Sequence, residues 1–194
     1  MSRAPRFDWV RRMGVHEAYH LDPINRLIHW LCIPIELAAV VTLLGAVPAP
    51  VDLGLVAIVL LGVVYVRADA PSGVAMTGLL LALRALTAPF TTGSAPLDAL
   101  VAIAVFVAAF VIQTRIGHGV FEHGIDDTEM NLAELARTRD PVPILLVFAY
   151  HALELLFAAG YRPAVREEVE RYRSAELARI ANDPRPRAAA HRVG

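Results

Sequence analysis

The chain has 194 residues, the size of one domain, and its net charge of -1 gives it no field that would attract nucleic acid. Apolar residues make up 56% of the sequence, whereas soluble domains average roughly 45–50% even when glycine is counted. This excess indicates an integral membrane protein. The single cysteine excludes an internal disulfide and any thiolate-rich metal site, so a bound metal would need nitrogen and oxygen ligands.

Residues 1–22 predict a short amphipathic helix on the membrane surface. Phe7, Val10 and either Met13 or Gly14 share one face, and arginines occupy other positions. Arginine on the polar side is typical of a helix that binds anionic headgroups. The segment lacks the apolar core of a signal peptide, so we expect no cleaved leader.

Residues 23–163 predict an all-α, membrane-embedded helical domain. Five apolar segments follow one another, at residues 27–47, 53–66, 73–88, 97–112 and 142–161. The first is long enough to cross a hydrocarbon core of roughly 30 Å, whereas the second is short for a full span. We therefore expect an integral membrane bundle of four to five hydrophobic segments. Arg84 interrupts the third segment and is expected to pair or to reach the headgroups, because contact with lipid is costly.

Charged stretches flank the last apolar segment. Residues 117–141 are expected to form a polar loop that carries an acidic surface helix at 126–139. This helix is expected to stop before Pro141, because a proline disfavours helix in the residue that precedes it. Residues 164–194 are expected to be a charged cytoplasmic tail that starts as a solvated helix and ends in disorder.

The arginines predict an orientation in an inner or plasma membrane. Arginines precede the first segment, Arg67 follows the second and Arg115 ends the fourth, so all of them fit one cytoplasmic side. A fifth full span would carry the arginine-rich tail outside, and we expect segment 142–161 to re-enter or to pack within the bundle. The same orientation puts the polar motif that opens the first segment and the one that follows the fourth at one membrane face, which predicts a shared site.

The motif around His20 opens the first segment. Asp22 is placed to cap a helix, and Pro23 suits the first turn of that helix. Asn25 and His29 then share one face, because residues four apart return to the same side of a helix. His20 precedes the proline, so it can fold back over the helix start.

Two further polar pairs have helical spacing, His118 with Glu122 and His151 with Glu154. A single histidine in an apolar helix is usually a hydrogen-bonded structural residue. Three such pairs favour mutual pairing or a metal, since ionisable groups near lipid are costly to bury. Imidazole and carboxylate without thiolate suit iron(II), zinc or manganese, and a facial set with open positions suits iron and oxygen chemistry. Zinc hydrolysis remains an alternative on the same ligands.

The other histidines carry less weight. His16 lies four residues before His20 and is a candidate to join it. His123 falls on a different helical face from Glu122, and His191 in the tail is not expected to take part.

These motifs resemble the signatures of a known family. The stretch His20-x-x-Pro-x-Asn25-Arg-x-x-His29-x-x-x-Ile-Pro resembles the N-terminal signature of the 2-hydroxy-palmitic acid dioxygenase family. Gln-x-x-Ile-Gly-His118-x-x-x-Glu122 resembles the second signature, and Glu154-Leu-Leu-Phe the third. The chain departs from the family at His16, where tyrosine is common, and in the residues after Glu122, where a basic stretch is typical.

The resemblance implies an iron(II)-dependent enzyme of fatty-acid α-oxidation that uses molecular oxygen to shorten a 2-hydroxy fatty acid by one carbon. It implies His20, His29 and His118 as metal ligands, with Glu122 and Glu154 as acidic partners. His151 is a metal-ligand candidate from its spacing alone, and Asn25 is a further catalytic candidate.

Three interpretations follow. The first is a membrane dioxygenase with Fe(2+), molecular oxygen as co-substrate and a lipid-like 2-hydroxy acid as substrate. The second is an enzyme on the same scaffold that acts on another lipid or an isoprenoid by metal-dependent or acid–base chemistry. The third is a non-catalytic membrane protein that binds a metal or a ligand. The sequence leaves the oligomeric state open.

Overall fold

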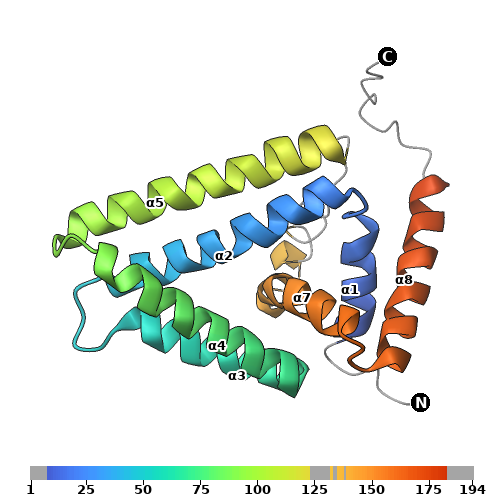
Figure 1. The fold of residues 1–194 in the computed structure, drawn as a ribbon, viewed down its shortest axis with the longest axis horizontal. Helices are drawn as coiled ribbons and strands as arrows, with labels where there is room; N and C mark the ends of the chain where they lie inside the picture. Colours follow the sequence, from blue (N-terminus) through green and yellow to red (C-terminus); the bar gives the residue numbers. More distant parts are fainter. Residues whose placement is uncertain (1–7, 123–131, 133–134, 138, 183–194) are drawn as a thin grey trace. The chain divides into compact units, whose positions relative to one another are not determined.

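The computed structural model describes residues 8–122, 132, 135–137 and 139–182 (Figure 1). Every regular element in this part of the chain is a helix, which confirms the all-α prediction. The contacts divide the chain into two compact units. One consists of residues 1–26 and 116–194, and the other of residues 27–115.

The unit of residues 27–115 is built from long apolar helices. They are α2 (Pro23–Gly45), α3 (Leu53–Ala68), α4 (Ala70–Thr87) with a short 3-10 helix η1 (Ala88–Phe90), and α5 (Ala95–Val111). Helices α3 and α4 lie side by side as a hairpin (Figure 1). A Cβ at Gly73 would lie 2.3 Å from the backbone nitrogen of Val66, so this contact requires a residue without a side chain.

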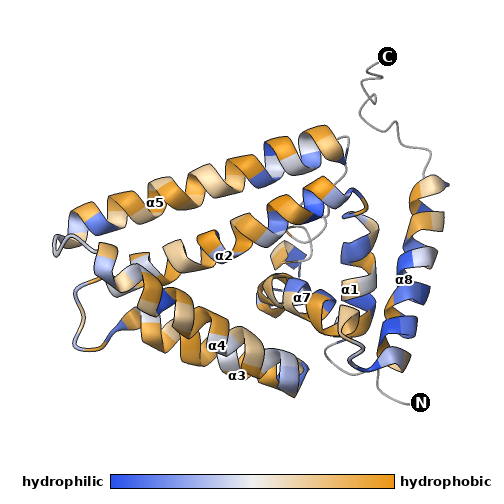
Figure 2. Cartoon of the chain, viewed as in Figure 1, coloured by the Kyte–Doolittle hydropathy of each residue, from blue (hydrophilic) through white to orange (hydrophobic). Residues whose placement is uncertain are grey.

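Three of the described helical stretches are long and apolar enough to cross a membrane, which indicates membrane association. They are Pro23–Gly45 with 23 residues, Ala70–Phe90 with 21 and Ala95–Phe121 with 27. Helix α3 and residues 144–158 are apolar but shorter. Figure 2 shows apolar residues along most of α2 and α5. The five expected apolar segments are therefore present as helices. A bundle with more than three membrane-spanning helices remains a prediction.

Arg84 in α4 is paired, as the sequence predicts. Its Nη2 lies 2.9 Å from Oδ2 of Asp52, in an ion pair whose two side chains are both partly exposed. Asp52 also accepts a hydrogen bond of 3.1 Å from the N–H of Leu55 and so caps α3. Its hydrogen bond with Arg84 holds the pKa of Asp52 below its ordinary value of 3.8.

The other unit contains α1 (Trp9–Ala18), α7 (Val142–Ala158) and α8 (Pro163–Ala181). Helix α1 packs along α8 and also contacts α7. A Cβ at Gly14 would lie 2.6 Å from both the Cβ of Tyr172 and the carbonyl oxygen of Val169, so the two helices meet at this glycine. Met13 and Val169 are fully buried. Helix α8 therefore covers the face of α1 that carries Met13 and Gly14, and α8 is not solvated on all sides.

Two expected boundaries also change. The segment from Gly117 to Phe121, expected as loop, is helical, because the chain continues beyond α5 as a π-helix, η2 (Ile112–Phe121). Arg115 consequently lies inside a helix and does not end it. Phe7, most of the acidic helix expected at 126–139 and residues 183–194 lie outside the described residues.

Candidate metal centre

The turn between α1 and α2 forms as the sequence predicts. Oδ1 of Asp22 accepts hydrogen bonds from the backbone N–H groups of Ile24 at 2.7 Å and of Asn25 at 3.2 Å, and α2 begins at Pro23. An aspartate cap of this kind satisfies N–H groups that have no partner within the helix. The cap therefore sets the start of the helix face that carries Asn25 and, one turn later, His29.

His20 folds back onto α1. Its Nδ1 lies 2.8 Å from the carbonyl oxygen of His16. A carbonyl can only accept, so Nδ1 carries a proton, and in the neutral imidazole Nε2 is then the nitrogen with the lone pair. Histidine ligands of metals are commonly oriented by such a bond to a backbone carbonyl. The local structure therefore presents Nε2 of His20 as a ligand atom.

The π-helix η2 positions His118 and Glu122. The N–H of Glu122 donates to the carbonyl of Gly117, five residues back, at 3.3 Å. This wide turn is rare, and it occurs frequently at functional sites. Oε1 of Glu122 accepts hydrogen bonds from the N–H of Asp22 at 2.7 Å and from Nδ2 of Asn25 at 3.3 Å. Glu122 thus ties the end of η2 to the start of α2, which places His118 beside His20.

The structure brings together the three histidines that the family resemblance implies as ligands. His20, His29 and His118 each offer a ring nitrogen, and these nitrogens all lie within 4.8 Å of one another. The rings of His20 and His118 have centroids 4.7 Å apart. All three side chains are buried. His29 follows Asn25 by one turn of the same unbroken helix, so the predicted shared face exists.

Helix α7 adds His151 and Glu154 to this region. The ring of His151 lies 5.6 Å from that of His16 and 6.4 Å from that of His20, measured between centroids. Nδ1 of His151 lies 3.7 Å from Oε2 of Glu154, and Nη2 of Arg26 lies 3.5 Å from the same oxygen. Burial lowers the pKa of His151, which favours the neutral imidazole that metals bind.

With this geometry in place, the comparison with known families is decisive. A family model described as 2-hydroxy-palmitic acid dioxygenase Mpo1-like matches residues 8–126, well over half of the chain. The chain belongs to this family. No curated protein and no solved structure matches it.

The matched region contains the three clustered histidines and the residues that position them. It extends from α1 through the start of α2 to the end of η2, and it includes Asn25 and Glu122. Helix α7 lies beyond it, so the family match does not reach His151 or Glu154. Their place in the site rests on the structure, which packs α7 against α1.

The structure places His16 beside His20, as its spacing suggested, and adds an ion pair that the sequence did not predict. The ring of His16, mentioned only as a candidate, lies 3.9 Å from that of His20 and 5.5 Å from that of Tyr150. Glu17 is buried and forms an ion pair with Arg166 of α8. Burial raises the pKa of Glu17, and the partner arginine opposes this shift. No local pattern could reveal the pair, because its two residues are 149 positions apart.

The donor set fits a metal ion that prefers nitrogen and oxygen. The nearby groups are imidazoles and carboxylates, and the one cysteine of the chain, Cys32, lies in α2 and is not part of the clustered set. Such a set suits iron(II), zinc or manganese. The fixed tautomer of His20 is a second feature that a metal ligand requires.

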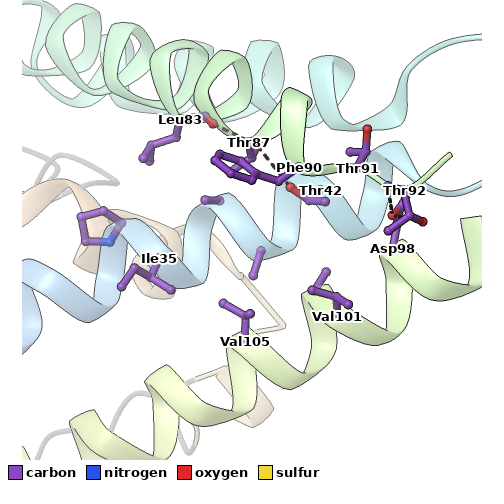
Figure 3. Close-up of a pocket in the computed structure, with 14 residues that line it drawn as sticks. Ile35, Thr42, Leu83, Thr87, Phe90, Thr91, Thr92, Asp98, Val101 and Val105 are labelled. Carbon is purple, nitrogen blue, oxygen red and sulfur yellow. Dashed lines mark hydrogen bonds between the residues drawn. The ribbon is translucent and has the colours of Figure 1, made fainter. Parts of the chain in front are cut away.

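A separate apolar cavity lies within residues 27–115 (Figure 3). It has a volume of about 350 Å³ and is lined by α2, α4, η1 and α5, with Ile35, Thr42, Phe90 and Val105 among its walls. A volume of this size is at the lower end of the range for ligand pockets. Ile35 and Thr42 occupy a different stripe of α2 from Asn25 and His29, so the cavity is not part of the histidine face.

Proposed function

We propose that this chain is a membrane-embedded iron(II) dioxygenase that converts a long-chain 2-hydroxy fatty acid to the acid one carbon shorter. The observation that carries the proposal is the buried cluster of His20, His29 and His118 inside the region that matches the dioxygenase family. The three apolar helices of spanning length support a substrate that partitions into the bilayer.

The reaction balances without a further reductant. A 2-hydroxy acid and one O₂ give the shorter carboxylic acid, CO₂ and water, as the bond between C1 and C2 breaks. The substrate carbons lose four electrons, and one O₂ accepts four. A bound iron(II) would supply a coordination site for the substrate's carboxylate and hydroxyl and would activate oxygen.

The residues of this chain supply orientation. The carbonyl of His16 holds the ring of His20, and Glu122 holds η2 against the first turn of α2, so two ligand candidates are fixed before substrate binds. Such fixed geometry provides much of the effect of a catalytic site. Asn25 donates to Glu122, which makes it a positioning residue in our proposal. The acyl tail would lie among apolar side chains, and each buried CH₂ contributes about 0.8 kcal/mol.

Arg26 forms an ion pair with Glu154 beside the imidazole of His151. The Arg26 side chain is half-exposed while that of Glu154 is buried. We propose that Glu154 accepts or returns the proton of the substrate's hydroxyl, since a carboxylate next to histidine ligands can manage protons. The orientation with this site at the cytoplasmic face follows from the arginines and is part of the proposal.

The test is turnover of 2-hydroxypalmitic acid by detergent-purified protein, followed by mass spectrometry of the products. Iron-loaded protein should form the acid one carbon shorter in air and none under strict anaerobiosis. Turnover that continues without oxygen, or with zinc alone, would support the alternative metal-dependent or acid–base enzyme instead. No turnover of any lipid with metal bound would support the non-catalytic alternative.

A further inference from the structure

We propose that the apolar cavity within residues 27–115 binds one acyl chain of a phospholipid whose head group carries a primary ammonium, the chemistry of phosphatidylethanolamine. The cavity is lined by α2, α4, η1 and α5, and all of its lining residues belong to one compact unit. This inference goes beyond the proposed function, because none of the clustered histidines lines the cavity and its occupant is not the proposed substrate.

The cavity has a polar side and an apolar side. Thr91, Thr92 and Asp98 lie at one side of it, whereas Ile35 and Leu83 lie at the other (Figure 3). Apolar side chains make up the rest of most of its wall. A molecule that fits both sides must therefore be amphipathic, with a small polar group attached to an apolar chain.

The polar side lies where the head group of a lipid would be. It includes part of segment 91–94, which connects two helical stretches of spanning length, Ala70–Phe90 and Ala95–Phe121. The connection between two helices that cross a bilayer lies at the membrane surface. Along α2 the lining runs from Thr42 back to Ile35, which is about 10 Å of helix. A cavity of about 350 Å³ is small among ligand pockets, so it suits one acyl chain rather than two.

The polar side offers acceptors of hydrogen bonds rather than donors. Oδ1 of Asp98 accepts from the N–H of Thr92 at 2.7 Å and from the hydroxyl of Thr92 at 2.8 Å. The hydroxyls of Thr87 and Thr91 donate to backbone carbonyls of their own helical turns, each at 2.9 Å. A hydroxyl has one proton to donate, so these oxygens can only accept a further hydrogen bond.

A primary ammonium matches this set of acceptors. It has three N–H donors, no acceptor and a positive charge, so it can bind the carboxylate of Asp98 and a threonine oxygen together. The trimethylammonium of phosphatidylcholine has the charge but no N–H donor. Asp98 would repel an anionic lipid or the carboxylate of a 2-hydroxy fatty acid, and none of the described residues that line the cavity is cationic.

The test is native mass spectrometry of the full chain in detergent, titrated with dioleoyl phosphatidylethanolamine, phosphatidylcholine or phosphatidylglycerol. The parent should retain one phosphatidylethanolamine and bind it about 10-fold more tightly than the other two lipids, because hydrogen bonds to a charged group stabilise the complex by about this factor or more. Equal binding of the three lipids, or binding of none, would overturn the inference and leave the proposed function intact.

Asp98→Asn tests the head group. It removes the charge and keeps an oxygen that can accept from Thr92, so it should abolish the preference for phosphatidylethanolamine over phosphatidylcholine. Glu167→Gln, which removes an exposed carboxylate of α8, is the matched control and should bind as the parent does. A preference that persists in Asp98→Asn would overturn the assignment of the ammonium to this carboxylate.

Val101→Trp tests the place of the acyl chain and serves as the second variant. Val101 lines the cavity from a half-exposed position of α5, so the larger ring should occupy space in the cavity and weaken binding of phosphatidylethanolamine by about 10-fold. Leu100→Trp adds the same ring at an exposed neighbour that does not line the cavity, and it should bind as the parent does. Equal binding by the two tryptophan variants would place the lipid elsewhere and overturn the inference.

Discussion

Hydrogen bonds, rather than spacing alone, distinguish the roles of individual residues in the site. His20 and Glu122 both resemble family signature residues, yet the ring of His20 is oriented by the carbonyl of His16 whereas one carboxylate oxygen of Glu122 accepts hydrogen bonds from the N–H of Asp22 and the side-chain amide of Asn25. Spacing could predict that Glu122 lies on the face of His118. It could not predict that its partner would be Asp22, because the two are 100 positions apart.

Removing a ligand should remove the metal. Alanine in place of His20, His29 or His118 should weaken metal binding by more than about 100-fold, because loss of a group that merely orients a ligand already costs about 10–100-fold. Metal titration of the purified variants measures the effect. His191→Ala, which lies outside the described residues, should bind as the parent does. Full occupancy in all three variants would show that these histidines are structural.

Glu122 should act through position rather than through its charge. Glu122→Gln keeps an oxygen that can accept from Asp22 and Asn25, so it should lower metal affinity by about 10-fold or less, whereas Glu122→Ala should cost up to about 100-fold. Isothermal titration with Mn²⁺ compares the two. Equal losses in both variants would mean that the negative charge itself is required.

Hydropathy was sufficient to predict the apolar helices of the chain. Each of the five apolar segments is helical, as is expected of apolar runs that would have to satisfy their own backbone groups in lipid. Residues 117–121 were predicted as loop from their polar composition, but they form a π-helical turn. Glu122 holds this turn against the start of α2, and the local sequence does not show that distant contact. The packing of α8 on α1 was not predicted for the same reason, since an amphipathic pattern does not indicate which helix packs against the apolar face.

The contact between α1 and α8 should be sensitive at Gly14. Gly14→Ala puts a Cβ 2.6 Å from Tyr172 and Val169, and overpacking of this kind typically costs about 1–3 kcal/mol. The melting temperature in detergent should fall accordingly. Gly78→Ala is the matched control, because nothing lies within 4 Å of a Cβ there and α4 is helical at that position. A loss as large at Gly78 would mean that the effect is not one of packing.

The ion pair of Asp52 and Arg84 should make stability depend on pH. The pKa of Asp52 is lowered in the folded state, so the pair stabilises the fold above the ordinary value of 3.8, and this contribution disappears as pH falls through the lowered pKa. Asp52→Asn retains the cap of α3 and loses the charge. It should lower the melting temperature at pH 7 and make little difference at a pH below the lowered pKa of Asp52.

Arg84→Gln tests whether the pair is the cause. In this background, Asp52→Asn should no longer lower the melting temperature at pH 7, because the guanidinium that stabilises the carboxylate is gone. An unchanged effect of Asp52→Asn would assign the pH dependence to another group.

For the whole molecule, composition indicated a membrane protein and the motifs indicated the family, and both are now supported. The excess of apolar residues corresponds to three helices of spanning length, and the family match covers the two clearest motifs. The third motif lies in α7, outside the match, and only the structure relates it to the others. The proposed activity therefore rests on two findings, the family match and the buried histidine cluster.

Isotopic labelling tests that proposal most directly. Iron-loaded protein is incubated with 2-hydroxypalmitic acid under ¹⁸O₂, and the shortened acid is analysed by mass spectrometry. Our account predicts one ¹⁸O atom in the new carboxyl group, with the other carboxyl oxygen retained from the substrate's hydroxyl, and no product from a His118→Ala variant. A shortened acid that contains no ¹⁸O, or one that forms equally well in the His118→Ala variant, would contradict it.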